Sequence, residues 1–202
     1  FISLNNETPI YITPVCDTTC TICQDGSCNS GIGLYKFEIV RVIDIGSSCD
    51  EIEIKTTQYN RAFSLTNGFS NSQAVFKATA DLSKSTKSPQ FRNVPRMELC
   101  LGFNAAMDHG LKKDTAIFDS VSYSLEKPES GGFFNQNYGT GFSYDKPITY
   151  WGYPNTNLNR PRGYNLDEER GILYFRPIKQ EYSINAVEAT YFKKKKKVGT
   201  AW

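Results

Sequence analysis

The chain has 202 residues, of which 39% are hydrophobic and 13% aromatic, and its formal net charge is +2. This content is sufficient for a buried core, which excludes a globally disordered chain. The small net charge provides no basic field for nucleic acid, and the apolar runs are far shorter than the roughly 20 residues of a membrane helix. The chain begins at Phe1 rather than Met, so we expect a processed product or an excised segment.

Residues 16–28, CDTTCTICQDGSC, contain four of the six cysteines. The C-x3-C-x2-C spacing of Cys16, Cys20 and Cys23 resembles the radical S-adenosylmethionine signature, whose three thiolates bind an iron–sulfur cluster. With Cys28 there are four thiolates, enough for structural zinc. The iron–sulfur signature normally follows the first strand of an α/β barrel, and the sequence lacks the alternating strand–helix series of such a barrel. Zinc ligands normally come from two separated knuckles, whereas here one short loop would supply all four.

Disulfide bonds are the interpretation that this segment favours. The residues between the cysteines are small and polar, so the segment has no core of its own and gains order from crosslinks. Cys49 and Cys100 would tie it to the rest of the chain, although six cysteines allow 15 pairings. Asn6-Glu7-Thr8 is a glycosylation sequon, which fits the same oxidising compartment. We therefore expect all six cysteines in disulfides, a glycan on Asn6, and an extracellular or cell-surface location.

Short alternating segments separated by Gly, Asn and Ser predict an all-β fold, an antiparallel sandwich or a jelly roll. In chain order, the predicted elements are strands at 34–45 and 51–56, a tight turn at Asn67-Gly68, strands at 97–103 and 116–125, and a hairpin of 172–178 with 182–192. The expected core residues are Ile39, Ile43, Ile52, Ile54, Leu99, Ile117, Val121, Tyr123 and Leu125. Residues 104–113 are the one helix candidate, although Gly110 weakens it.

The composition changes after Pro128. Residues 129–165 are rich in Gly, Asn, Pro and aromatics and contain no cysteine. They are too aromatic for a solvated linker and too irregular for a sheet, which predicts an extended aromatic arm packed on a neighbouring chain. The densest aromatic cluster in it consists of Tyr150, Trp151 and Tyr153. It predicts either a protein interface or a sugar-stacking surface, the alternative being rings that cover the chain's own core.

Lys193 to Lys197 form a run of five lysines, which predicts a solvated tail or, alternatively, a site for anionic polymer or lipid headgroups. Together these patterns divide the chain into three parts. Residues 1–33 are a disulfide-rich segment, residues 34–128 a β-sandwich domain, and residues 129–202 the extended aromatic arm with a terminal hairpin and a Lys-rich tail.

Several short motifs occur in the order typical of one family. Cys28 is followed by LYKFE and then by Cys49, after which come Asn67-Gly68, MELCLGF and YSLEKP. This order, over residues 16–127, resembles the pherophorin-type domain of green-algal extracellular matrix glycoproteins. That family usually has further cysteines near the end of the domain, whereas none follows Cys100 here. The resemblance implies an extracellular structural or carbohydrate-associated module without catalysis.

The sequence contains no pattern of catalytic residues. His109 is the only histidine, no nucleophile motif lies beside it, and we predict that it lies at the surface. Acidic groups such as Glu51 with Glu53, or residues 167–169, carry no sign of two carboxylates facing across a cleft. There is no G-x-G-x-x-G and no Walker loop. The sequence therefore predicts no enzyme, no metal and no cofactor.

Together these features predict a non-enzymatic structural subunit of an extracellular assembly, such as a matrix, a surface filament or an appendage. Its partners would be other copies of itself or neighbouring structural proteins, with no nucleic acid and no membrane span. A secreted carbohydrate-binding β-sandwich module is the alternative from another class, and a virion coat component is the third hypothesis.

Overall fold

The computed structural model describes residues 10–12, 34–36, 49–58, 65–68, 73–84, 87–93, 99–131, 138–151 and 163–202. The chain divides into two units, Phe1–Ser47 with Arg96–Cys100, and Ser48–Pro95 with Leu101–Trp202. In the first unit, β1 (Ile10–Ile12) pairs antiparallel with β2 (Leu34–Lys36). The predicted sites Asn6, Cys16, Cys20, Cys23 and Cys28, and the predicted core residues Ile39 and Ile43, lie outside the described residues.

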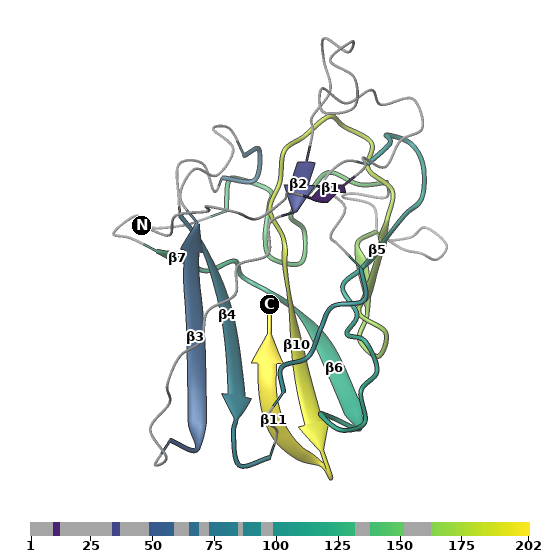
Figure 1. Cartoon of the computed structure of the whole chain (residues 1–202). Helices are drawn as coiled ribbons and strands as arrows, with labels where there is room; N and C mark the ends of the chain where they lie inside the picture. Colours follow the sequence, from purple (N-terminus) through teal and green to yellow (C-terminus); the bar gives the residue numbers. More distant parts are fainter. Residues whose placement is uncertain are drawn as a thin grey trace. The chain divides into compact units, whose positions relative to one another are not determined.

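The second unit contains a large antiparallel sheet in the order β3-β4-β11-β10-β6, with the short β7 paired to one end of β4 (Figure 1). Its strands are β3 (Glu51–Gln58), β4 (Gln73–Asp81), β6 (Ser120–Glu126), β7 (Ser130–Gly131), β10 (Ala186–Lys193) and β11 (Lys196–Ala201). β11 comes last along the chain but lies between β4 and β10 in the sheet.

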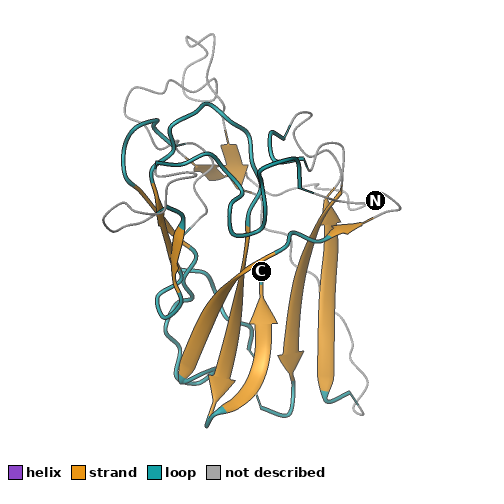
Figure 2. Cartoon of the chain, turned by 180° about the vertical axis from the view of Figure 1, so that it is seen from behind, coloured by secondary structure: helices purple, strands orange, loops and turns teal. Residues whose placement is uncertain are grey.

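A smaller antiparallel sheet, in the order β5-β9-β8, completes the second unit. It consists of β5 (Ala105–Asp108), β8 (Asn165–Asp167) and β9 (Ile172–Phe175). The part of the chain that the structure describes contains strands and loops but no helix (Figure 2). The second unit is thus an all-β, antiparallel, sandwich-like domain, and the predicted fold class is confirmed.

The core lies between the two sheets because both supply apolar side chains at alternate positions. Val187, Ala189 and Tyr191 of β10 share a face with Tyr123 of β6, which lies opposite Ala189. The buried core cluster consists of Leu111, Ile117, Phe118, Tyr123, Val187, Ala189, Tyr191 and Val198, with Val121, Leu125 and Leu166 packed against it. The last of these belongs to β8 and joins the small sheet to the core. The predicted core face of residues 116–125 is therefore confirmed.

The helix predicted at residues 104–113 is wrong, because its first half forms β5 and pairs with β9. Buried Leu173 and Phe175 of β9 give that neighbouring strand its apolar face. The strand predicted at 97–103 also differs from the structure, since its described residues, 99–103, form a loop and turn. A 3.2 Å hydrogen bond from the Gly68 N–H to the Leu65 carbonyl oxygen closes a turn here, but its central residues are Thr66 and Asn67, one position before the predicted Asn67-Gly68 pair.

Residues after position 162 are part of the same domain and do not form an appended arm, because they supply β8, β9, β10 and β11. The lysine run is not a tail, because it spans the end of β10, a hairpin turn and the start of β11. Lys194 and Lys195 have φ values of 49° and 65°, and they connect β10 to β11. The hairpin predicted between 172–178 and 182–192 is also wrong, since β9 lies in the small sheet while β10 pairs with β6 and β11.

Candidate functional site

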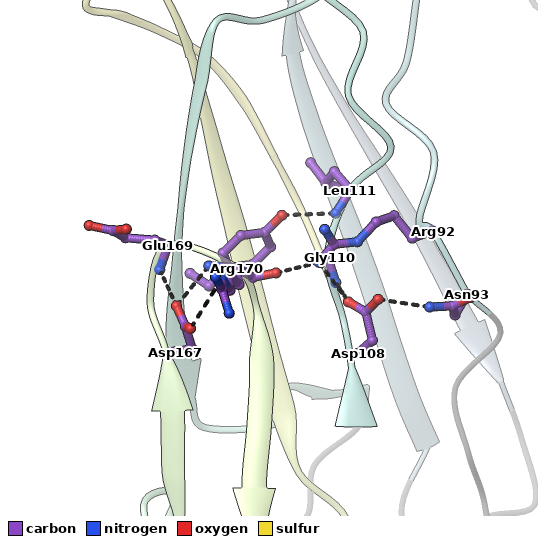
Figure 3. A network of polar contacts seen from close by, with 9 residues as sticks. Arg92, Asn93, Asp108, Gly110, Leu111, Asp167, Glu169 and Arg170 are labelled. Atoms are coloured by element: carbon purple, nitrogen blue, oxygen red, sulfur yellow. Dashed lines mark hydrogen bonds and ion pairs between the residues drawn. The ribbon is translucent and has the colours of Figure 1, made fainter. Parts of the chain in front are cut away.

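A network of polar contacts holds the end of β5 (Figure 3). The carboxylate of Asp108 accepts hydrogen bonds from the Arg92 guanidinium (2.8 Å), the Asn93 side-chain amide (2.7 Å) and the Gly110 N–H (2.8 Å). Partial burial raises the pKa of Asp108, but the hydrogen bonds from Gly110 and Arg92 lower it by more than burial raises it. The net pKa therefore lies below its ordinary value. Asp108 is therefore a fixed, ionised group whose oxygens are already engaged.

Arg92 also connects this network to the turn after β8. Its guanidinium donates to the Arg170 carbonyl oxygen (2.6 Å), and one oxygen of Asp167 accepts the N–H groups of Glu169 (3.1 Å) and Arg170 (2.9 Å), as Figure 3 shows. Asp167 thus stabilises its own turn, while Arg92 joins that turn to β5. The contacts account for both carboxylates as groups that hold loops together.

His109 lies next to this network, and it is partly buried rather than fully at the predicted surface position. The Nε2 atom has no hydrogen-bond partner among the described residues, while the backbone N–H donates to the Gly171 carbonyl oxygen (2.8 Å). Burial lowers the pKa of His109, and the charge of Asp108 offsets only part of that effect. Burial therefore favours the neutral form of the imidazole.

The structure describes two of the three aromatic residues predicted as an interface or sugar site, Tyr150 and Trp151, and gives them different environments. Tyr150 is buried and stacks on Tyr164 with a centroid distance of 6.0 Å and an interplanar angle of 26°. Tyr164 in turn lies 5.1 Å from Phe175, and burial raises the pKa of its phenol. Tyr150 is thus part of the core rather than of a surface. Tyr153 lies outside the described residues.

In contrast to the buried Tyr150, Trp151 lies at the surface, where 53% of its area is exposed. The backbone N–H of Trp151 donates to the Arg176 carbonyl oxygen (2.8 Å), which fixes the two residues side by side. The guanidinium carbon of Arg176 lies 5.8 Å from the centroid of the indole ring, a cation–π distance, and its Nε donates to the Asn104 side-chain oxygen (2.9 Å). Two contacts therefore hold the Arg176 side chain beside the ring.

This pair lies where three segments of the chain are neighbours. The Gly102 N–H donates to the Pro177 carbonyl oxygen (2.7 Å), and Tyr150 forms a bridge with Pro177, so residues 101–104, 176–178 and 149–151 are neighbours. Each contributes exposed apolar side chains. We define the Trp151 surface as Trp151, Arg176, Asn104, Leu101, Phe103 and Ile178. Phe103 is 71% exposed, and Trp and Arg are the residue types most often dominant in protein interfaces.

Sequence reasoning missed most of the Trp151 surface. Leu101 and Phe103 were expected in a buried strand, and nothing near Trp151 in the sequence points to Arg176, which is 25 positions away. The apolar MELCLGF pattern describes hydrophobicity but not the turn that exposes two of its residues.

The two described cysteines differ from each other. Cys100 is disulfide-bonded, whereas Cys49 is exposed with a free thiol, so the pairing expected for Cys49 is not found. Within the described ranges, no three His, Cys, Asp or Glu side chains come together as metal ligands. The same residues include no helix long and apolar enough to cross a membrane. No family model, curated protein or solved structure matches the chain.

Proposed function

We propose that this protein is a non-enzymatic structural subunit of an extracellular assembly, a matrix, surface filament or appendage, that assembles through protein contacts. The observation that supports the proposal is the Trp151 surface. Three neighbouring segments each carry exposed apolar side chains, and two of them supply a Trp–Arg pair that hydrogen bonds and a cation–π contact hold in place. A preformed arrangement loses little side-chain freedom on binding, which favours association.

Trp151→Ala tests this proposal. If the ring anchors an interface, its removal should raise the dissociation constant of the assembly by about 30-fold or more, the effect of a hot-spot residue. Sedimentation velocity over a concentration series measures this. Tyr144→Ala is the matched control, because Tyr144 is also an exposed aromatic residue in the same stretch of chain but lies outside the Trp151 surface. If Trp151→Ala assembles as the wild type does, the Trp151 surface is not the interface.

Carbohydrate binding is the second candidate, and the same exposed indole favours it. A flat aromatic face beside the donors of Arg176 and the amide of Asn104 offers both stacking and hydrogen bonding to a sugar ring. A glycan array with wild type and Trp151→Ala separates the two hypotheses. A monomer that binds one glycan class through Trp151 would favour this candidate over assembly.

A further inference from the structure

Strand β3 forms one edge of the large sheet and, among the described strands, pairs only with β4 (Figure 1). Its register with β4 runs over all eight residues without a shift, so the strand has no bulge, and it contains no proline. Bulges and prolines are two of the common features that keep the edge strands of a sheet from pairing with another chain, and β3 has neither. The opposite edge differs, since the N–H of Tyr123 on β6 donates to the Glu168 carbonyl oxygen (2.9 Å) and is thereby covered.

Backbone groups of β3 point alternately to β4 and to the open side. The Leu82 N–H donates to the Asp50 carbonyl oxygen (2.7 Å), and in the continuing register these two residues lie opposite each other. Opposite residues of an antiparallel pair exchange hydrogen bonds at every second position. The N–H and C=O groups that point away from β4 are therefore those of Glu51, Glu53, Lys55 and Thr57.

Apolar side chains continue to this edge. Ala78 of β4 lies opposite Ile54 on one side and opposite Ala201 on the other, and Ala201 lies opposite the buried Ala189. Ile54 is therefore on the face of the sheet that forms the core, as is Phe76, two residues before Ala78. Yet Ile54 is 53% exposed and Phe76 is 46% exposed. The expected burial of Ile54 is thus wrong for the single chain, and the apolar face extends beyond the core.

We propose that β3 pairs antiparallel with β3 of a second copy of this chain, about a two-fold axis at Ile54. The two large sheets then form one continuous sheet. This proposal rests on the assembly function proposed above, names a second copy of the chain as the partner, and adds a contact separate from the Trp151 surface. It pairs the outward backbone groups of both strands, for which no described residue supplies a hydrogen bond, and brings the two exposed Ile54 side chains together.

Charge selects the register. With Ile54 opposite Ile54 of the second copy, Glu53 faces Lys55 of the other chain, and Glu51 faces Thr57. The adjacent registers that keep the outward residues paired place Glu53 opposite itself or Lys55 opposite itself, and directly opposed like charges are destabilising. In the proposed register Ile54 occupies a non-hydrogen-bonded position, where opposing side chains approach most closely.

Lys55 supplies a further argument. It lies opposite Lys77 in the β3–β4 pair, an unfavourable arrangement that Glu53 relieves at 3.0 Å from Lys55 and 2.9 Å from Lys77. A second copy places another carboxylate directly opposite Lys55. The lysine that is unfavourable beside Lys77 is therefore favourable across the proposed contact.

A cysteine crosslink tests the register in the full chain. The variant Cys49→Ser/Ile54→Cys removes the exposed thiol and places two thiols across the two-fold axis, with a Cα separation of about 4.5 Å that a disulfide can span. Mild oxidation should convert most of the protein to a covalent dimer on a non-reducing gel. In the control Cys49→Ser/Ile52→Cys, the two thiols would be four strand positions apart, roughly 13 Å, and should not crosslink. Equal crosslinking of both variants overturns the proposed register.

A charge reversal tests the contact independently. Lys55→Glu should raise the dimer dissociation constant by about tenfold or more, because two attractive pairs become repulsive. Glu53→Lys/Lys55→Glu restores opposite charges and should return the dissociation constant to within about threefold of the wild type. If neither variant changes the dimer while Trp151→Ala does, the β3 contact is refuted and the assembly function stands. If the wild type stays monomeric at every concentration, both proposals fail.

Discussion

Replacing Gly199 by alanine should destabilise the fold, although Gly→Ala within a strand usually stabilises it. Gly199 lies on β11 directly opposite Tyr191 of β10. A Cβ at this position would lie 2.0 Å from the Thr79 carbonyl oxygen and 2.4 Å from the Tyr191 hydroxyl oxygen. The Tyr191 hydroxyl itself donates to that carbonyl at 3.0 Å. The glycine therefore leaves room for a buried ring to cross β11 and reach β4.

Ordinarily, Gly→Ala within a strand stabilises by roughly 0.5–1 kcal/mol. In Gly199→Ala, overpacking should cost about 1–3 kcal/mol, since a backbone atom must move. Displacement of the Tyr191 hydroxyl should cost about 1 kcal/mol more. The net result should be a loss of about 2 kcal/mol in the free energy of unfolding.

Urea unfolding followed by far-UV circular dichroism measures this change, provided that the slope with denaturant stays constant. Tyr191→Phe alone should cost about 1 kcal/mol, since it removes one hydrogen bond. Gly199→Ala should cost less in the Tyr191→Phe background, because that hydrogen bond is already absent and the hydroxyl no longer blocks the methyl group. If Gly199→Ala is neutral or stabilising, the position of β11 between β4 and β10 is incorrect.

Three further predictions concern the C-terminal strands, pH and the free thiol. Deletion of residues 186–202 removes β10 and β11 and should abolish cooperative unfolding in calorimetry, whereas a truncated chain with a sharp transition would show that these strands are dispensable. Burial lowers the pKa of His109 in the folded chain below its ordinary value of 6.5. As the pH falls from 7 to 5, the unfolded chain therefore binds more protons at His109 than the folded chain does, and the free energy of unfolding should fall. His109→Phe should remove most of this slope, and an unchanged slope would assign it to other groups. Cys49 should take up one maleimide in native buffer by intact mass, a label that Cys49→Ser should lose; a wild type without that label would indicate a bonded Cys49.

The alternation of apolar and polar residues was sufficient to predict a strand and its core side where the strand has one apolar and one polar face. β6 follows this rule, with Val121, Tyr123 and Leu125 on the core side. β5 was mistaken for a helix because Ala105, Ala106 and Met107 have high helix propensity, and pairing with β9 overrides that local preference. The β10–β11 hairpin was missed because its turn uses two lysines at positive φ instead of Asn-Gly, the strongest sequence signal for such a turn.

The candidate surface was predictable only in part. Aromatic density pointed to Tyr150 and Trp151 together, yet they have opposite orientations. Tyr150 is buried because it packs against Tyr164, whereas Trp151 is held outward beside Arg176. Both partners are distant in the sequence, so no local pattern could separate the two residues. The expectation that all six cysteines form disulfides relied partly on their even number. An even number gives no information about whether another thiol lies close enough to Cys49 to pair with it.

The central position of β11 has a consequence for biosynthesis. A ribosome completes β3, β4 and β6 before β10 and β11 exist, and about 75 residues separate the end of β6 from the end of β11. At about 5–20 residues per second, the nascent chain presents two unjoined parts of the sheet for roughly 4–15 s. During this interval the inner edge of β4 and the apolar side of β6 are open to other nascent chains. The hairpin of β10 and β11 can form within about 1–10 μs of its emergence. Translation, rather than strand pairing, therefore determines how long the chain needs protection from aggregation.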